Sequence, residues 1–205
     1  MMFLGLLLAA YLIGSFPTAL LVGKIAFDVD IRELGSQNPG ATNSLRVLGK
    51  TAAIVVLIFD VGKGVLAASL PALFHLEYES LYFGMASVVG HCFPIFAGFR
   101  GGKAIATTAG TLIFISLPLF SAAYLAFFAV IFLTKYVFLG SISVGLSLLA
   151  YSLWSQNIGF EILFLLFSLL LLYLHRSNIR NLILGIEPKI NDKKLKKDRI
   201  PPKKL

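Results

Sequence analysis

The feature that most constrains this chain is a series of long apolar runs almost free of charge. The longest, Ala104–Thr134, has 31 residues without one Asp, Glu, Lys or Arg. Soluble domains are about 45–50% apolar, whereas 58% of these 205 residues are hydrophobic. A transmembrane helix needs about 20 consecutive apolar residues. The pattern therefore predicts an all-α, polytopic membrane protein.

The number of spans depends on the longest run. As one helix it would be about 46 Å long, too long for a hydrocarbon core of about 30 Å without a steep tilt. Pro118 lies near its middle, so we expect a turn there and seven transmembrane helices. The first run has no basic residues before it, which favours a span over a signal peptide. The apolar runs are Met1–Val22, Thr51–Phe74, Leu81–Phe99, Ala104–Thr134, Val137–Trp154 and Ile158–Leu174.

The distribution of charge favours the seven-helix topology. With the N-terminus outside, one side of the membrane holds the acidic Glu77, Glu79 and Glu161 and no basic residue. The cytoplasmic side holds Lys24, Arg32, Arg46, Lys50, Arg100, Lys103, Lys135 and the ten Lys and Arg residues from Arg176 to Lys204. A single long helix would divide these basic segments between both sides, against the positive-inside rule. We therefore expect a cytoplasmic C-terminus.

The domain organisation follows from the same pattern. Residues 1–188 are predicted to form one integral-membrane domain, and residues 189–205 a disordered basic cytoplasmic tail that is attracted to anionic lipid. The net charge of +8 lies in short loops and in this tail, so no nucleic-acid partner is predicted. Cys92 is the single cysteine and excludes an intramolecular disulfide. With no HExxH motif and no Cys/His or carboxylate cluster, we expect neither a metal nor a cofactor.

Three polar islands interrupt the apolar sequence, and all three fall on the predicted cytoplasmic face. The first reads GSQNPGATN from Gly35 to Asn43 and is followed by Arg46 and Lys50. The second reads GFRGGK from Gly98 to Lys103 and leads into an apolar run. Backbone N–H groups of glycine-rich turns, helix N-termini and nearby cations are suited to phosphate. The two islands predict a site for two phosphates, or for one phosphate and a polar headgroup.

The third island begins at His175 and contains Ser177, Asn178 and Arg180. Its histidine is either an interfacial residue or a group that orients a hydroxyl or stabilises charge. Within the second apolar run, Asp60 and Lys63 are three residues apart, share a helical face and are expected to neutralise each other. Ionisable residues inside a membrane are also functional candidates. This pair and the paired loops leave open a small transporter or channel for a phosphorylated solute.

The three islands together resemble the motifs of the bacterial membrane glycerol-3-phosphate acyltransferases that use acyl phosphate. GSQNPGATN resembles the first motif of that family, GHCFPIFAGFRGGKAIAT the second and HRSNIRNLILGIEPK the third. The resemblance extends from the first span to about Lys189, with the motifs in the same order. Within these motifs Gln37 stands where glycine is common, Arg100 where lysine is frequent, and Asn181 where arginine is usual.

The resemblance implies a bacterial inner-membrane enzyme with its active site on the cytoplasmic face. It would transfer an acyl group from acyl phosphate to the 1-hydroxyl of glycerol 3-phosphate, giving lysophosphatidic acid and phosphate. It also implies a functional link to an enzyme that forms acyl phosphate. Catalytic roles would fall to Ser36, Arg46, Lys103 and His175, and substrate binding to Gly35, Asn38, Gly40, Thr42, Asn43, Gly101, Gly102, Ser141 and Asn178. Direct attack without a covalent enzyme intermediate is expected, because phosphate is a good leaving group.

Overall fold

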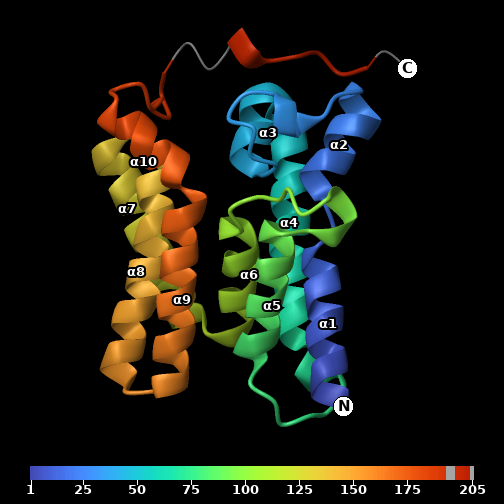
Figure 1. The fold of residues 1–205 in the computed structure, drawn as a ribbon, viewed down its shortest axis with the longest axis vertical. Helices are drawn as coiled ribbons and strands as arrows, with labels where there is room; N and C mark the ends of the chain where they lie inside the picture. Colours follow the sequence, from blue (N-terminus) through green and yellow to red (C-terminus); the bar gives the residue numbers. More distant parts are fainter. Residues whose placement is uncertain (193–196, 204–205) are drawn as a thin grey trace. The chain divides into compact units, whose positions relative to one another are not determined.

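The computed structural model describes residues 1–192 and 197–203, and among these it contains helices and no β-strand (Figure 1). The chain forms two compact units, one of residues 1–115 with the C-terminal residues 197–203, the other of residues 116–192. The all-α prediction is thereby confirmed for the part of the chain that is described.

The first unit contains most of the helices. They are α1 (Met2–Gly14), α2 (Thr18–Phe27), the 3-10 turn η1 (Ile31–Glu33), α3 (Ala41–Val47), α4 (Lys50–Leu73), α5 (Ser80–Cys92), the 3-10 turn η2 (Ile95–Ala97) and α6 (Ile105–Ile115). The second unit contains α7 (Leu117–Thr134), α8 (Val137–Ser155), α9 (Ile158–Leu174) and α10 (Arg176–Ile183). In the first unit the N-terminus and the α4–α5 connection lie at one end, and α3 lies at the other (Figure 1).

Proline residues account for two breaks. The first apolar run does not continue as one helix to Val22, because the chain breaks after Gly14 and α2 begins at Thr18, directly after Pro17. Proline lacks the N–H needed to continue the helix and disfavours the α conformation of the residue before it. The predicted break near Pro118 is confirmed. Ser116 caps α7 by accepting a hydrogen bond from the Leu119 N–H, and Pro118 lies in the first turn.

Glycine allows the helices of the first unit to pack closely. A Cβ on Gly64 of α4 would lie 2.1 Å from the Thr107 carbonyl oxygen of α6, and one on Gly110 of α6 would lie 1.9 Å from the Val61 carbonyl oxygen of α4. Contacts of this kind are typical of membrane helices, whose association depends on close van der Waals packing. Glycines therefore set the α4–α6 distance.

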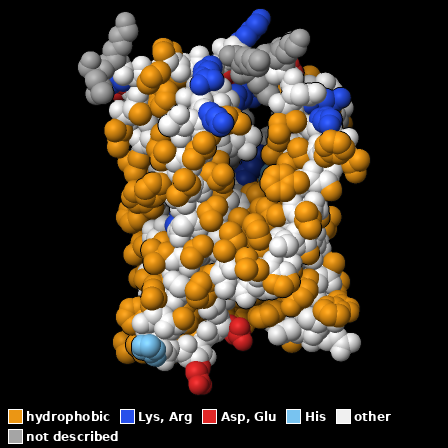
Figure 2. All heavy atoms as spheres, turned by 180° about the vertical axis from the view of Figure 1, so that it is seen from behind, with side chains coloured by type: hydrophobic (Ala, Val, Ile, Leu, Met, Phe, Trp, Pro, Cys, Tyr) orange, Lys and Arg blue, Asp and Glu red, His pale blue; other side chains and the backbone are white. Residues whose placement is uncertain are grey.

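The outer surfaces of the helices are apolar, as a lipid environment requires. Figure 2 shows hydrophobic side chains along the sides of the helices. Within the described part of the chain, five segments are long and apolar enough to cross a membrane, namely Met2–Phe27, Lys50–Leu73, Ser80–Ala97, Leu117–Thr134 and Val137–Ser155. A sixth is present if α9 and α10, which are bent by 53° to each other, form one span. Helix α6 has 11 residues and is shorter. The chain is therefore a multi-pass membrane protein, and the count of seven stays a prediction.

The C-terminal residues 197–203 differ from the disordered tail that we expected. The Ile200 N–H donates to the Val47 carbonyl at 3.0 Å, and the Lys203 N–H donates to the Ala26 carbonyl at 2.9 Å. The Ile200 side chain packs against the apolar cluster around Val47 and Leu48. Apolar burial and backbone hydrogen bonds thus bind these residues to α2 and α3. Of the rest of the predicted tail, residues 189–192 are described, and the Ile190 N–H donates to the Lys135 carbonyl at 2.9 Å. Residues 193–196 and 204–205 lie outside the described residues.

Candidate functional site

The first polar island is folded by the side chain of Asn43. The Asn43 Oδ1 accepts the Ser36 N–H at 2.9 Å, and the Asn43 amide donates to the carbonyls of Leu34 at 3.0 Å and Ile31 at 3.2 Å. The Asn43 side chain is buried, and its bond to the Ile31 carbonyl is shielded from water, whereas its bonds to Ser36 and Leu34 are partly buried. Its contacts hold the loop that leads into α3, which gives this predicted substrate-binding residue a loop-forming role.

Two residues of the same loop have a left-handed backbone. Gly35 has φ +60°, and a Cβ there would lie 2.3 Å from the Asn43 Oδ1, so the position requires glycine. Gln37 also has φ +60°. The left-handed backbone explains why glycine is common at this position in the family that the motifs resemble, and why glutamine is strained there.

The second polar island is a tight turn built against the end of α5. The Gly102 N–H donates to the His91 carbonyl at 3.1 Å. A Cβ on Gly101 would lie 2.1 Å from the same carbonyl oxygen, so no larger residue fits without a backbone shift. Phe99 and Ala104, on either side of the two glycines, have φ +59° and +56°. Such conformations of residues other than glycine store strain and are concentrated at functional sites.

Arg32 joins the two loops. Its Nη1 donates to the Ala97 carbonyl at 2.8 Å, while its Nε and Nη2 bond to the Asp30 carboxylate, with a shortest distance of 2.6 Å. The Arg32 guanidinium lowers the pKa of Asp30 to about 2, so the pair stays charged at neutral pH. Sequence reasoning placed Arg32 only in a basic loop and missed this link. The spacing Asp30-x-Arg32 was its one local signal.

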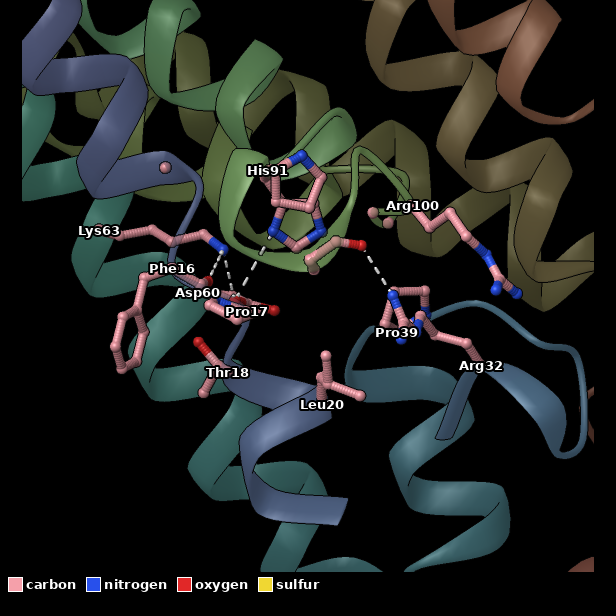
Figure 3. A pocket seen from close by; sticks show the side chains of 15 residues that line it. Phe16, Pro17, Thr18, Leu20, Arg32, Pro39, Asp60, Lys63, His91 and Arg100 are labelled. Atoms are coloured by element: carbon pink, nitrogen blue, oxygen red, sulfur yellow. Dashed lines mark hydrogen bonds and ion pairs between the residues drawn. The ribbon is translucent and has the colours of Figure 1, made fainter. Parts of the chain in front are cut away.

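A pocket lies where these loops meet the helices of the first unit (Figure 3). Its walls come from the α1–α2 break, α4, the end of α5 and both loops. They include Gly14, Phe16, Pro17, Thr18, Leu20, Arg32, Pro39, Asp60, Lys63, His91, Pro94, Ala97, Arg100, Gly101 and Gly102. Apolar residues of the α1–α2 break thus face basic groups and the glycine turn. Such a mixed lining suits a ligand with a charged end and an apolar end.

The pocket wall contains a charged pair and two glycines that the sequence analysis singled out. The predicted Asp60–Lys63 pair forms, with the Lys63 Nζ 2.8 Å from the Asp60 Oδ1. His91 is buried, and its Nδ1 lies 3.3 Å from the Thr107 Oγ1. Of the predicted site residues, Gly101 and Gly102 line the pocket.

Other predicted residues of the first unit lie in the loops around the pocket. Ser36 and Thr42 are exposed, Gly40 precedes α3 and its N–H donates to the Asn38 carbonyl at 2.9 Å, and Lys103 follows the glycine turn. Arg46 lies in the last turn of α3 and its Nε pairs with the Asp198 carboxylate of the C-terminal segment. A group proposed to bind phosphate is therefore already paired with an anion of the same chain.

The third island lies in the second unit, at the bend between α9 and α10. His175 is 1% exposed, and its Nδ1 lies 2.8 Å from the Leu171 carbonyl oxygen. Because a carbonyl only accepts, Nδ1 carries the proton and Nε2 is the basic nitrogen of the neutral ring. Asn178 donates to the Glu187 Oε1 at 2.6 Å, and the Ser141 hydroxyl donates to the Val137 carbonyl at 3.2 Å. That these residues join the two loops of the first unit in one site stays a prediction.

Comparison with known proteins places this chain in a family. The sequence model of the family described as glycerol-3-phosphate acyltransferase matches residues 4–185. A glycerol-3-phosphate acyltransferase of Macrococcus caseolyticus is 46% identical over 189 residues, which are 92% of this chain and 97% of the relative. Glycerol-3-phosphate acyltransferase 2 of Bacillus cereus is 46% identical over 192 residues, or 94% of this chain and 97% of the relative.

Solved structures agree with the sequence comparison. The glycerol 3-phosphate form of PlsY (YgiH), an integral membrane glycerol 3-phosphate acyltransferase, superposes with a TM-score of 0.83 at 32% identity, covering 91% of this chain and 94% of that one. The lysophosphatidic acid form of PlsY (YgiH) gives a TM-score of 0.79 at 31% identity with the same coverage. The family model and the high identity over nearly the whole length show that this chain belongs to the glycerol-3-phosphate acyltransferase family.

Proposed function

We propose that this protein transfers an acyl group from acyl phosphate to the 1-hydroxyl of glycerol 3-phosphate. The observation that carries the proposal is the pair of glycine-rich loops that meet, through Arg32 and Gly102, at a pocket with one apolar wall. Both substrates carry phosphate and the donor also carries an acyl chain, so this lining suits them. Relatives solved in glycerol 3-phosphate and lysophosphatidic acid forms support the same reaction.

The reaction is proposed to be a direct displacement. The 1-hydroxyl oxygen of glycerol 3-phosphate attacks the carbonyl carbon of acyl phosphate, and a new ester bond forms. The bond between that carbon and the phosphate oxygen breaks, with its electron pair leaving on phosphate. Because the donor is already activated, the protein mainly positions the reactants and neutralises the charge on the departing phosphate.

The residue roles follow from the chemistry that each group offers. Ser36, Arg46 and Lys103 are proposed to act on the reacting phosphates, with Asn38, Gly40, Thr42 and the Gly101–Gly102 turn as further ligands. Gly35 and Asn43 shape the first loop. Ser141, His175 and Asn178 are proposed to hold glycerol 3-phosphate. The proton of the attacking 1-hydroxyl is accepted either by the Nε2 of His175 or by a phosphate oxygen of glycerol 3-phosphate.

The histidine role has a direct test. Single-turnover measurements with a His175→Ala variant separate binding from chemistry. A base at His175 requires the chemical step to slow by at least about a hundredfold, the lower range for general-base catalysis. Loss of glycerol 3-phosphate binding with an unchanged chemical step would instead leave the substrate phosphate as the base.

The proposed location is the bacterial inner membrane, with seven spans, an outside N-terminus and the site at the cytoplasmic face. The apolar surfaces of the helices and the basic residues near α2 and α3 support this orientation. A soluble enzyme that forms acyl phosphate would then supply the donor from the same side. No step in the proposed mechanism needs a metal or cofactor.

One assay tests the proposed function. Purified protein is incubated with glycerol 3-phosphate and either palmitoyl phosphate or palmitoyl-CoA, with and without EDTA, and the lipid product is identified by mass spectrometry. Lysophosphatidic acid is expected from palmitoyl phosphate alone and should be insensitive to EDTA. Absence of product would favour the transporter interpretation, and a requirement for a divalent metal would favour a lipid phosphotransferase.

A further inference from the structure

Beneath the Gly101–Gly102 turn lies a buried polar cluster to which the proposed mechanism assigns no role. It consists of Asp60 and Lys63 of α4, His91 of α5 and Thr107 of α6. The Lys63 Nζ lies 2.8 Å from the Asp60 Oδ1 and donates to the Phe16 carbonyl at 3.3 Å. The His91 Nδ1 lies 3.7 Å from the Asp60 Oδ1 and 3.3 Å from the Thr107 Oγ1. The cluster therefore connects three helices with the α1–α2 break.

Stability alone is a weak explanation for this cluster. Asp60 is 1% exposed and Lys63 is 7% exposed, so both charges have lost nearly all contact with solvent. Removing two charges from water costs several kcal/mol per ion in proteins, which their mutual attraction often does not recover. Apolar residues would span a membrane without this cost. A buried ion pair at the wall of a pocket therefore invites a functional explanation.

His91 carries the contact between the cluster and the glycine turn. Its carbonyl accepts the Gly102 N–H at 3.1 Å, and a Cβ on Gly102 would lie only 2.3 Å from its Nε2. The ring thus packs directly against Gly102 through one edge and faces Asp60 and Thr107 through the other. Figure 3 shows His91 beside Asp60 and Lys63, with Arg32 and Arg100 farther along the pocket.

The turn that His91 supports is strained. Phe99 and Ala104, on either side of the glycines, have left-handed backbones. Such conformations are strained and persist only where the surroundings enforce them. The His91 ring and carbonyl supply contacts of this kind. The position of the Gly102 N–H therefore depends on the orientation of His91, and that orientation depends on Thr107 and on the Asp60–Lys63 pair.

We propose that Asp60, Lys63, His91 and Thr107 are positioning residues that hold the Gly101–Gly102 turn in the geometry needed to bind a substrate phosphate. They act through the turn and touch no reacting atom. The inference rests on the proposed function, since it concerns the phosphate ligands of that same site. Its consequence is that weakening the cluster reduces phosphate affinity rather than the rate of the bound complex.

A matched pair of variants tests the proposal. Thr107→Val removes the hydroxyl that faces His91. Thr111→Val removes an equally buried hydroxyl one turn later, which donates to the Thr107 carbonyl of its own helix at 3.1 Å. We measure KM and kcat for glycerol 3-phosphate and palmitoyl phosphate, and Tm in detergent. Thr107→Val is expected to raise KM for at least one substrate about two- to tenfold, the effect of one hydrogen bond, with kcat within twofold. Thr111→Val is expected to leave both constants unchanged.

Variants of His91 and of the ion pair give independent tests. His91→Asn keeps a polar group near Thr107 and is expected to retain a lower KM than His91→Leu. The double variant Asp60→Asn/Lys63→Gln leaves no unpaired buried charge, and it is expected to raise KM with a Tm within a few degrees of the wild type.

Three results would overturn the inference. They are equal KM values for Thr107→Val and Thr111→Val, equal KM values for the two His91 variants, and a loss confined to kcat. Wild-type activity with acyl phosphate is measured alongside, so a failure of the proposed function itself is recognised separately.

Discussion

At the residue scale, the left-handed positions of the first loop show how single residues determine its shape. Gly35 and Gln37 both have φ +60°, but only Gly35 also lies against Asn43. The loop can thus tolerate a side chain at Gln37, at the expense of backbone strain. The same left-handed geometry explains why glycine is preferred at position 37, although no ligand role is evident there.

Substitutions at these two residues should have opposite effects on stability. Gln37→Gly is expected to stabilise the protein by roughly 0.5–1 kcal/mol. It removes the left-handed penalty of about 1–2 kcal/mol, which is larger than the entropic cost of a glycine, roughly 0.5–1 kcal/mol. Gly35→Ala is expected to destabilise, since its Cβ would meet the Asn43 Oδ1 at 2.3 Å. Thermal unfolding in detergent measures both. A lower Tm for Gln37→Gly would contradict the strain argument.

Arg46 and Asp198 give a second prediction for single residues. The pair is partly exposed, with 23% and 33% of the side chains accessible, and such pairs contribute about 0.2–1 kcal/mol. If Arg46 binds a substrate phosphate, the Asp198 carboxylate competes with it. Asp198→Asn is therefore expected to lower KM for one substrate by up to about fivefold. The control is an Arg46→Ala background, in which the Asp198 substitution should have no further effect, and an equal effect in both backgrounds would exclude competition at Arg46.

At the scale of elements, the contact between α4 and α6 carries the second polar loop. Helix α6 begins at Ile105, directly after the glycine turn, and packs on α4 through Gly64 and Gly110. Thr107 of α6 also belongs to the cluster around His91. The distance between the two helices therefore determines where the turn lies.

Two glycines of α4 allow the effect of the α4–α6 distance on stability and activity to be measured. Gly64→Ala would bring a Cβ within 2.1 Å of the Thr107 carbonyl oxygen, whereas Gly62→Ala meets nothing within 4 Å. We expect Gly64→Ala to lower stability by about 1–3 kcal/mol, the usual cost of overpacking, and to reduce activity. Gly62→Ala is expected to be neutral or slightly stabilising. Similar Tm values for the two variants would show that the α4–α6 contact can relax.

At the scale of the whole molecule, the open question is whether α6 crosses the membrane. Its 11 residues have a length of about 16 Å, roughly half of the hydrocarbon core. The seven-span topology nevertheless requires Ser116, between α6 and α7, to reach the outside. This requirement distinguishes it from a topology in which α6 enters and leaves the same side.

Single introduced cysteines test the topology in a Cys92→Ala background. A membrane-impermeant maleimide should label Glu77→Cys, Ser116→Cys and Gln156→Cys in intact cells. Lys24→Cys and Lys135→Cys should react only after permeabilisation. If α6 does not cross while α7 and α8 do, Ser116→Cys and Gln156→Cys should react only after permeabilisation and Lys135→Cys should be labelled in intact cells. That pattern would contradict the seven-span topology and would reduce the span count by one.

The class of the protein and several local features could be predicted from the amino-acid sequence. Long uncharged runs require a lipid environment, the proline at 118 predicted the α6–α7 break, and helical periodicity placed Asp60 beside Lys63. The polar loops were recognisable because glycine, amide and basic residues are rare within apolar sequence. These features depend on composition or on residues a few positions apart, which a single sequence displays directly.

The contacts between groups distant in the sequence could not be predicted and are known from the folded structure. Arg32 bonds to a carbonyl 65 residues away, Arg46 pairs with a carboxylate 152 residues away, and the His91 ring packs against Gly102 behind a turn. The first apolar run is divided into α1 and α2 by a break just before Thr18, and the C-terminal segment is hydrogen-bonded to α2 and α3. No local periodicity encodes such contacts, because they arise when packed helices bring separate loops together and buried polar groups then require partners.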